Sequence, residues 1–182
     1  MTTSPNALQR LVDRQEIQDA LARYARGVDR GDWELVRSVY HPDAHDQHGS
    51  FNGGVDGLIS WLTDRFEGVD NSVHFLGNCL IEPTGPDSAI VETYFVSARL
   101  TTKDPHRTIG DGDALSRQAW GRYVDHFTRR DTIWRIARRT VVVDGRFQSP
   151  ALGGARTAED SWGARNRTDP LHVARSAARL TS

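Results

Sequence analysis

The spacing of apolar residues changes once along this chain, close to residue 70. Before that point apolar residues recur every three to four positions, first from Leu8 to Val28 and again from Val55 to Phe66, and this spacing indicates amphipathic helices. After it come four runs rich in Val, Ile, Tyr, Phe and Thr, a composition typical of strands: residues 73–82, 89–101, 114–128 and 132–143. Helices followed by antiparallel strands predict an α+β fold in which a curved sheet wraps around the N-terminal helices.

The boundaries between the predicted helices carry recognisable end signals. The first helix should stop at Arg30-Gly31-Asp32, and the Asp32 side chain can cap a second, short helix through Trp33 and Tyr40. Gly68 closes the third helix. The remaining connections are a turn at 41–44, a short polar strand at 45–51, hairpin-type connections at 82–87 and 129–131, and a longer loop at 104–112.

The length of 182 residues suits a single domain with one hydrophobic core. We expect that domain to span residues 1–148. Residues 149–182 lose the periodic pattern and are rich in Gly, Ala, Arg and Ser, so they form a tail rather than a second domain. The tail would cover a pocket, act as an arm in an oligomer, or stay disordered.

Composition narrows the class of partner. The formal net charge is −1, so no electrostatic argument favours nucleic acid or an anionic membrane as a partner. The single cysteine, Cys79, excludes an internal disulfide and a site built from several thiolates. The N-terminus lacks a signal-peptide pattern and no apolar run reaches membrane-spanning length, so we expect a cytoplasmic protein.

Asp29 and His74 are ionisable residues that lie in apolar stretches of the sequence. Such side chains are costly to bury unless they have a partner. If the Asp29 carboxylate held one imidazole nitrogen of His74, the other nitrogen would become more basic, which makes a general base. Their spacing does not prove that they meet. A helix-ending Asp29 and a structural, buried His74 are the alternatives.

Tyr24 lies five residues before Asp29 on the first predicted helix. On an ideal helix the two side chains would point about 140° apart. They would share a site only if the end of the helix deformed near Gly27.

The segment from His41 to His48 holds the densest group of possible metal ligands. A site for iron with two histidines and one carboxylate is conceivable there, but we expect no metal. We instead assign Asp46 and His48 to the wall of a pocket, in contact with a substrate hydroxyl. Among the aromatic residues, most of which should belong to the core, we assign to the same wall Trp33, Phe51 and Trp120.

Four stretches of the chain resemble the SnoaL-like branch of the NTF2-like superfamily. They are Ile17 to Asp29 with the following Trp33 and Tyr40-His41-Pro42-Asp43-Ala44, the segment Ser72 to Asn78, the segment Tyr123 to Phe127 with Trp134 and Arg139, and the tail segment Trp162 to Pro170. The resemblance implies a cone-shaped α+β fold with an Asp–His pair at the bottom of an apolar cavity. The same cone carries several activities and also plain binding proteins.

Within that branch the chain resembles proteins of the bile acid 7α-dehydratase and hexachlorocyclohexane dehydrochlorinase type. The dehydratase's Tyr, Asp, His and Arg fall on Tyr24, Asp29, His74 and Arg139. From the strand pattern alone, an outward Arg139 is an alternative, with Arg138 as the competing inward residue.

The resemblance and the residues together predict a lyase that needs no cofactor and acts on a hydrophobic hydroxylated ring or aromatic compound. His74, oriented by Asp29, would remove a proton, and Tyr24 or Arg139 would donate to the oxygen that gains charge. The reaction would be a dehydratase-type elimination or a retro-aldol loss of an aldehyde. An isomerase or cyclase with the same base, or a non-catalytic ligand-binding module, are the alternatives. We expect a homodimer or homotrimer.

Overall fold

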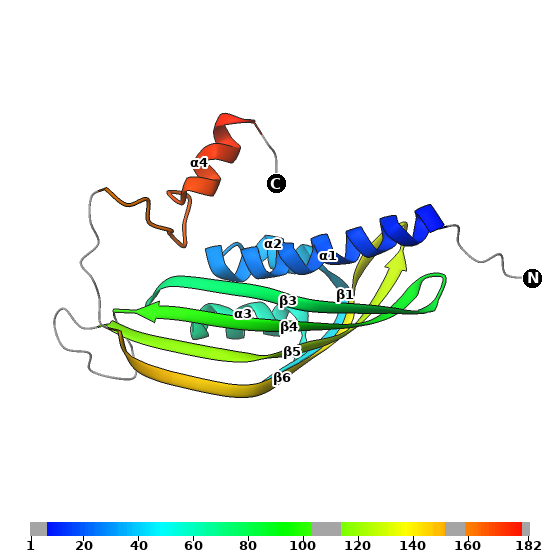
Figure 1. Ribbon diagram of the computed structural model, residues 1–182, viewed down its shortest axis with the longest axis horizontal. Helices are drawn as coiled ribbons and strands as arrows, with labels where there is room; N and C mark the ends of the chain where they lie inside the picture. Colours follow the sequence, from blue (N-terminus) through cyan, green and yellow to red (C-terminus); the bar gives the residue numbers. More distant parts are fainter. Residues whose placement is uncertain (1–6, 103–113, 152–158, 180–182) are drawn as a thin grey trace, which may run out of the picture.

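The computed structural model describes residues 7–102, 114–151 and 159–179. The helices and strands along the chain are α1 (Ala7–Arg30), α2 (Trp33–Ser38), β1 (Tyr40–His48), β2 (Phe51–Gly54), α3 (Val55–Arg65), β3 (Val69–Gly85), β4 (Ser88–Thr101), β5 (Ala114–Arg130), β6 (Ile133–Ala151) and α4 (Pro170–Ala177) (Figure 1). The loop expected at 104–112 lies outside the described residues. No helix in the described part of the chain has the length and hydrophobicity that a membrane span requires.

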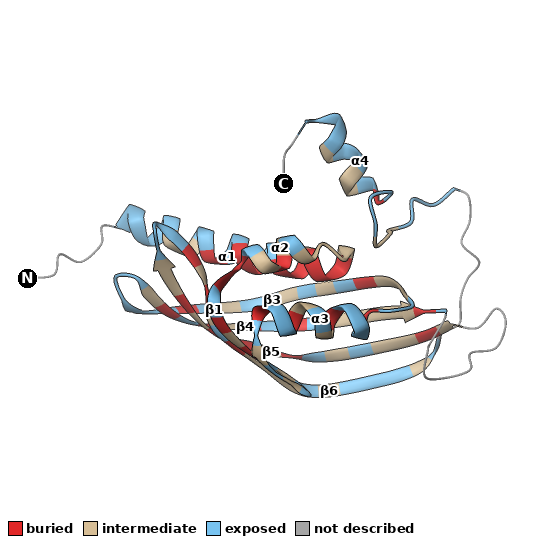
Figure 2. Cartoon of the chain, turned by 180° about the vertical axis from the view of Figure 1, so that it is seen from behind, coloured by how far each residue is buried: buried red, intermediate tan, exposed pale blue. Residues whose placement is uncertain are grey.

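The six strands form one curved sheet in the order β2-β1-β6-β5-β4-β3. All neighbouring strands are antiparallel except β1 and β6, which run parallel. Helix α1 runs along the sheet beside β3, and α3 lies across the face seen in Figure 2. Buried residues gather where the helices meet the sheet (Figure 2). This arrangement confirms the predicted α+β fold with a sheet wrapped around the N-terminal helices.

A bulge lets strands β5 and β6 bend around the helices. The pairing of these strands shifts register between Trp120 and Gly121, and such bulges increase the local bend of a sheet. A Cβ atom at Gly121 would collide with the carbonyl oxygen of Val142. Glycine is therefore the residue that this close approach of two backbones requires.

The end of α1 is a regular helix that packs closely on α2. A Cβ atom at Gly27 would lie 2.7 Å from Cγ2 of Val36 and 3.0 Å from the carbonyl oxygen of Asp32, so the missing side chain allows the two helices to approach. Helix α1 continues to Arg30. The deformation near Gly27 that would bring Tyr24 and Asp29 to the same side of the helix does not occur. The predicted cap of α2 is confirmed, since the backbone N–H of Leu35 donates to Asp32 at 3.1 Å.

One local prediction was wrong. Residues 41–44, expected to form a turn, belong to β1, which begins at Tyr40 and pairs with β6 with a register shift before His45. The buried His41 and Ala44 anchor this irregular strand in the core. The tail, for which a pocket cover, an oligomer arm and a disordered segment were the alternatives, contains α4, capped by the Asp169 side chain and carrying a proline in its first turn.

Candidate active site

A cavity of about 300 Å³ lies between the helices and the inner face of the sheet. Its deep wall combines aromatic side chains with two histidines, whereas its more exposed wall carries three arginines. The residues of the deep wall include Tyr24, His48, His74, Phe95 and Tyr123, and the arginines are Arg65, Arg99 and Arg146. Cavities of this kind, with few polar groups converging on an apolar space, are where small molecules bind.

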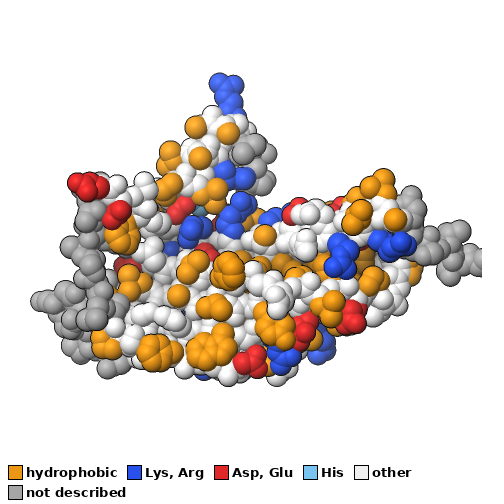
Figure 3. All heavy atoms as spheres, in the orientation of Figure 1, with side chains coloured by type: hydrophobic (Ala, Val, Ile, Leu, Met, Phe, Trp, Pro, Cys, Tyr) orange, Lys and Arg blue, Asp and Glu red, His pale blue; other side chains and the backbone are white. Residues whose placement is uncertain are grey.

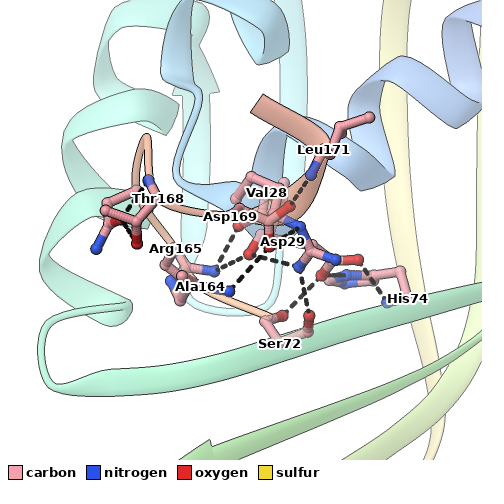
Figure 4. A network of polar contacts seen from close by, with 11 residues as sticks. Val28, Asp29, Ser72, His74, Ala164, Arg165, Thr168, Asp169 and Leu171 are labelled. Carbon is pink, nitrogen blue, oxygen red and sulfur yellow. Dashed lines mark hydrogen bonds and ion pairs between the residues drawn. The ribbon is translucent and has the colours of Figure 1, made fainter. Parts of the chain in front are cut away.

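His74 on β3 and Asp29 at the end of α1 are hydrogen-bonded across the two elements (Figure 4). The His74 Nδ1 and Asp29 Oδ1 atoms are 2.7 Å apart, and the backbone N–H of His74 donates to Asp29 Oδ2 at 2.8 Å. The Ser72 hydroxyl also donates to Asp29 Oδ1 at 2.7 Å. Only 10% of the His74 side chain and 8% of the Asp29 side chain are exposed. The predicted contact between the two residues is therefore confirmed.

These contacts fix the charge of Asp29 and the orientation of the His74 ring. Burial alone would raise the pKa of Asp29, but the hydrogen bonds and charge of His74 together with the Ser72 hydroxyl outweigh it and hold the pKa below its usual value. A carboxylate only accepts hydrogen bonds, so Nδ1 of His74 carries the proton. Whenever the ring is neutral, Nε2 is therefore the nitrogen without a proton, and His74 is part of the cavity wall.

The lowered pKa of Asp29 makes the stability of the fold depend on pH. Its folded pKa lies below the ordinary value of 3.8, so the ionised carboxylate stabilises the fold above that pH, and this contribution is lost as pH falls through the folded pKa. We expect Asp29→Asn to be less stable than wild type at about pH 6. The gap between their free energies of unfolding should narrow at about pH 3. Urea denaturation at both pH values measures it. A gap that stays constant or widens on acidification would contradict this assignment.

Tyr24 reaches the cavity from the C-terminal part of α1, where it is 1% exposed. Its ring meets that of Tyr123 edge-on, with ring centroids 5.6 Å apart. Burial raises the pKa of Tyr24 well above its usual value, so its hydroxyl stays protonated at neutral pH. Tyr24 lines the cavity and Asp29 does not. The two side chains can therefore serve one site although they point in different directions from a regular helix. Asp29 holds His74 from behind instead.

Arg139 points inward, but it is not among the residues that line the cavity. Its Nε and Nη2 atoms donate to the two carboxylate oxygens of Asp125 at 2.7 and 2.6 Å. The guanidinium carbon lies 4.2 Å from the ring centre of Tyr24 and 4.1 Å from that of Tyr123. Burial opposes the charge of Arg139, but the charge of Asp125 prevails and raises its pKa, so the guanidinium stays charged. Arg139 supports the tyrosines of the wall from behind.

Of the five residues assigned to the pocket wall, His48 lines the cavity. Asp46 is 1% exposed and lies behind His48, where it accepts a hydrogen bond from the Tyr40 hydroxyl at 2.7 Å. The nearest oxygen of Asp46 is 3.6 Å from Nδ1 of His48. Burial lowers the pKa of His48, and Asp46 offsets part of this effect, so His48 is neutral at neutral pH.

The three aromatic residues assigned to the wall lie elsewhere. Trp33 packs edge-on against Phe66, and Phe51 packs against Trp61. Trp120 is 45% exposed, because its strand neighbour Ala119 takes the inward position. Aromatic residues that do line the cavity were not assigned to it from the sequence. They are Trp61, Phe66, Phe95 and Tyr123. Phe95 could have been found from strand alternation, since it shares a face with Ser97, which pairs with His74.

The possible metal ligands of β1 point in different directions. His41 contacts the carbonyl oxygen of Thr128 at 3.0 Å, His45 contacts the Asn52 side chain at 2.6 Å, and Asp46 is engaged by Tyr40. Within the ranges that the structure describes, no three His, Cys, Asp or Glu side chains converge on a point where they could hold a metal ion.

The tail docks on the end of α1, next to the Asp29–His74 pair (Figure 4). The Arg165 guanidinium donates to the carbonyl oxygens of Val28 and Asp29 at 2.7 and 3.0 Å. Asp169 forms an ion pair with Arg30 at 3.2 Å. Positive side chains at the C-terminal carbonyls of a helix are favourable, so these contacts hold the tail and the helix end together.

Comparison with known proteins agrees with this architecture. A family model described as a SnoaL-like domain matches residues 9–140. Over 132 residues the chain is 31% identical to Rv2910c, an uncharacterised protein of Mycobacterium tuberculosis, covering 70% of this chain and 82% of that protein.

Two solved structures share the fold. A scytalone dehydratase-like protein from Novosphingobium aromaticivorans has a TM-score of 0.66 and 17% identity, covering 84% of this chain and 97% of that one. A type 2 hexachlorocyclohexane dehydrochlorinase has a TM-score of 0.67 and 18% identity, with the same coverage. At these identities the likeness concerns the fold. The family model, by contrast, matches most of the chain, and the protein therefore belongs to the SnoaL-like family of the NTF2-like superfamily.

Proposed function

We propose that this protein is a lyase that needs no cofactor and removes water from a hydroxylated ring or aromatic compound. The observation that carries the proposal is the His74 ring, which belongs to the cavity wall while Asp29 holds its Nδ1 atom at 2.7 Å. A neutral imidazole oriented in this way is suited to take a proton from a carbon atom. The fold shared with dehydratase-type and dehydrochlorinase structures supports an enzyme of this broad kind.

In the proposed reaction, Nε2 of His74 takes a proton from the carbon next to an activating group. The electrons of the broken C–H bond form the new double bond, and the neighbouring C–O bond breaks. The His74 imidazolium then gives its proton to the departing hydroxyl, which leaves as water. Asp29 stabilises the imidazolium in between. The charge of His74 and the proton count are both restored at the end of the cycle.

Tyr24 contributes a hydrogen bond rather than a proton. Because its pKa is raised by burial, its hydroxyl is a poor acid but a permanent donor. Directed at the oxygen that gains negative charge, it would stabilise the transition state in a cavity with little water. We assign no direct contact with substrate to Arg139, since two of its nitrogens are bonded to Asp125 and tyrosine rings cover it. His48, which is neutral and also lines the cavity, would contact a substrate hydroxyl.

A screen of hydroxylated steroids and lignin-type aromatic alcohols tests the proposal, with products identified by mass spectrometry. We expect at least one compound to yield a product lighter by one water molecule. A retro-aldol reaction with the same base would release a small aldehyde, and an isomerase or cyclase would leave the mass unchanged. Compounds that bind but are returned unaltered would indicate a ligand-binding module and contradict the proposed activity.

The outer face of the sheet supports the expected homodimer or homotrimer. Exposed apolar side chains gather on this face (Figure 3), among them Phe75, Val96 and Trp120, which follow one another across β3, β4 and β5. Phe75 is 71% exposed. Contiguous apolar patches of this kind are typical of protein contact surfaces, so we propose that copies of the chain associate through this face.

A further inference from the structure

Three arginines form part of the cavity wall that the proposed elimination does not use. Arg65 lies at the end of α3, Arg99 on β4 and Arg146 on β6, so three separate elements direct a guanidinium toward the same space. Arg99 also pairs directly with Arg117 across β4 and β5. Like charges that face each other in a sheet are destabilising. The chain as a whole carries a net charge of −1, so this gathering of positive charge is local.

The carboxylates of the site are engaged elsewhere. Asp29 is bonded to His74 and Asp125 to Arg139. Two arginines of the wall contact aromatic rings instead: the Arg65 guanidinium lies 5.0 Å from the centre of Trp61, and that of Arg99 lies 5.0 Å from the centre of Phe66. In the three ranges that the structure describes, no ion pair joins a carboxylate to either of them or to Arg146.

Burial, together with repulsion from neighbouring arginines, lowers the pKa values of Arg65 and Arg99. Burial, followed by the charges of the surrounding arginines, lowers the pKa of Arg99 to about 10. Arg99 nevertheless remains charged at neutral pH. A guanidinium that lies over an aromatic ring can keep the N–H donors at its edge available for an oxyanion. Several such edges around a partly enclosed space concentrate a positive potential there.

We propose that Arg65, Arg99 and Arg146 bind a negatively charged group of the substrate, so that this site prefers ring acids to neutral alcohols. A carboxylate or a phosphate on the ring would satisfy the same donors. The anionic end would lie at the arginines and the hydroxylated ring at Tyr24 and His74. The orientation of the substrate in this assignment rests on the proposed function. The preference for an anion concerns binding alone and does not depend on the reaction.

Equilibrium binding of matched two-ring probes, measured by isothermal titration calorimetry with the full chain, tests the anion site. The probes are 2-naphthoate, 2-naphthyl phosphate and the neutral 2-naphthamide. We expect one of the anions to bind about tenfold tighter than the amide, or more, because hydrogen bonds to charged groups are the strong ones. Which anion is preferred identifies the charged group. The advantage should shrink as salt is raised.

Matched variants assign the effect to these residues. Arg99→Gln should abolish the anion preference, and Arg146→Gln, at an exposed position where folding is not at stake, should reduce it. Arg138→Gln, which removes an exposed arginine of the same strand β6 that does not line the cavity, should leave it unchanged. Equal binding of anion and amide, or an anion preference that survives both Arg99→Gln and Arg146→Gln, would overturn the proposal.

The same experiment separates this inference from the proposed activity. His74→Ala should keep the anion preference, because the base does not contact the charged end. If neutral alcohols are dehydrated but no probe shows an anion preference, the anion site is wrong and the elimination stands. If the preference is present but no hydroxylated acid is converted, the anion site stands and the elimination is wrong.

Discussion

Replacing His74 by Ala should remove nearly all turnover, by about 10³-fold or more, while the fold stays intact. The physical reason is that no other group of the cavity wall combines an unprotonated nitrogen with a carboxylate partner at 2.7 Å among the described residues. Asp29→Asn keeps the shape but allows the wrong imidazole tautomer, so it should also be severe. Steady-state kinetics on a compound from the screen, with circular dichroism as a check on folding, measures both effects.

Two further variants show whether the loss of turnover is specific to His74. Tyr24→Phe removes one hydroxyl and should cost about 10- to 100-fold. His126→Ala removes a histidine of β5 that contacts Ser88 and does not line the cavity, and should leave turnover unchanged. If Tyr24→Phe proved far more damaging than His74→Ala, the tyrosine would be the principal acid–base group and the roles assigned here would be wrong.

Arg139→Met should destabilise the fold by about 3–5 kcal/mol, because it leaves the Asp125 carboxylate buried without a counter-charge. Both residues are at most 1% exposed. Replacing the pair together, as Arg139→Met with Asp125→Leu, should recover most of the loss, since a buried ion pair is often replaceable by apolar groups of similar size. Chemical denaturation of the two single variants and the double variant measures the three free energies of unfolding.

The solvent-accessible pair of Arg122 and Glu92 provides the control for this series. Its members are 31% and 33% exposed, and Arg122→Gln should cost far less stability than Arg139→Met, because an exposed ion pair contributes little. A single Arg139→Met variant as stable as Arg122→Gln would mean that Arg139 does not act as the buried counter-charge of Asp125. A double variant less stable than both single variants would show that the tyrosines depend on the guanidinium itself.

The sequence was sufficient for most helices and strands, because their periods are local patterns, whereas the central pair of the site needed the family resemblance as well. Helical and strand periods are properties of short segments, and the cap at Asp32 is a contact three residues long. The pairing of Asp29 with His74 spans 45 residues. It was inferred from two ionisable residues in apolar surroundings and from the family resemblance, and the geometry agrees.

The choice between Arg138 and Arg139 could not be made from the sequence, and the reason is a shift in strand register. Phe127 pairs with Ile136 across β5 and β6. If that register continued, Asp125 would face Arg138. A bulge between His126 and Phe127 moves the pairing by one residue, so Asp125 faces Arg139 instead. One inserted residue reverses which side chain is buried, and no local composition signals it.

The residues of the cavity wall were predicted less well than the Asp29–His74 pair. Trp33, Phe51 and Trp120 were chosen as large aromatic residues, but size does not determine which face a residue occupies. The arginines of the wall were overlooked because scattered basic residues usually lie on solvated surfaces. Arg99 and Arg146 come together in the wall only after strands β4, β5 and β6 are placed in register.

The mass of the product formed from one hydroxylated ring compound, by wild type and by His74→Ala side by side, tests the central claim most directly. We expect a product lighter by one water molecule with wild type and none above the uncatalysed rate with His74→Ala. Equal loss of water with both proteins, or a wild-type product of unchanged mass, would contradict it.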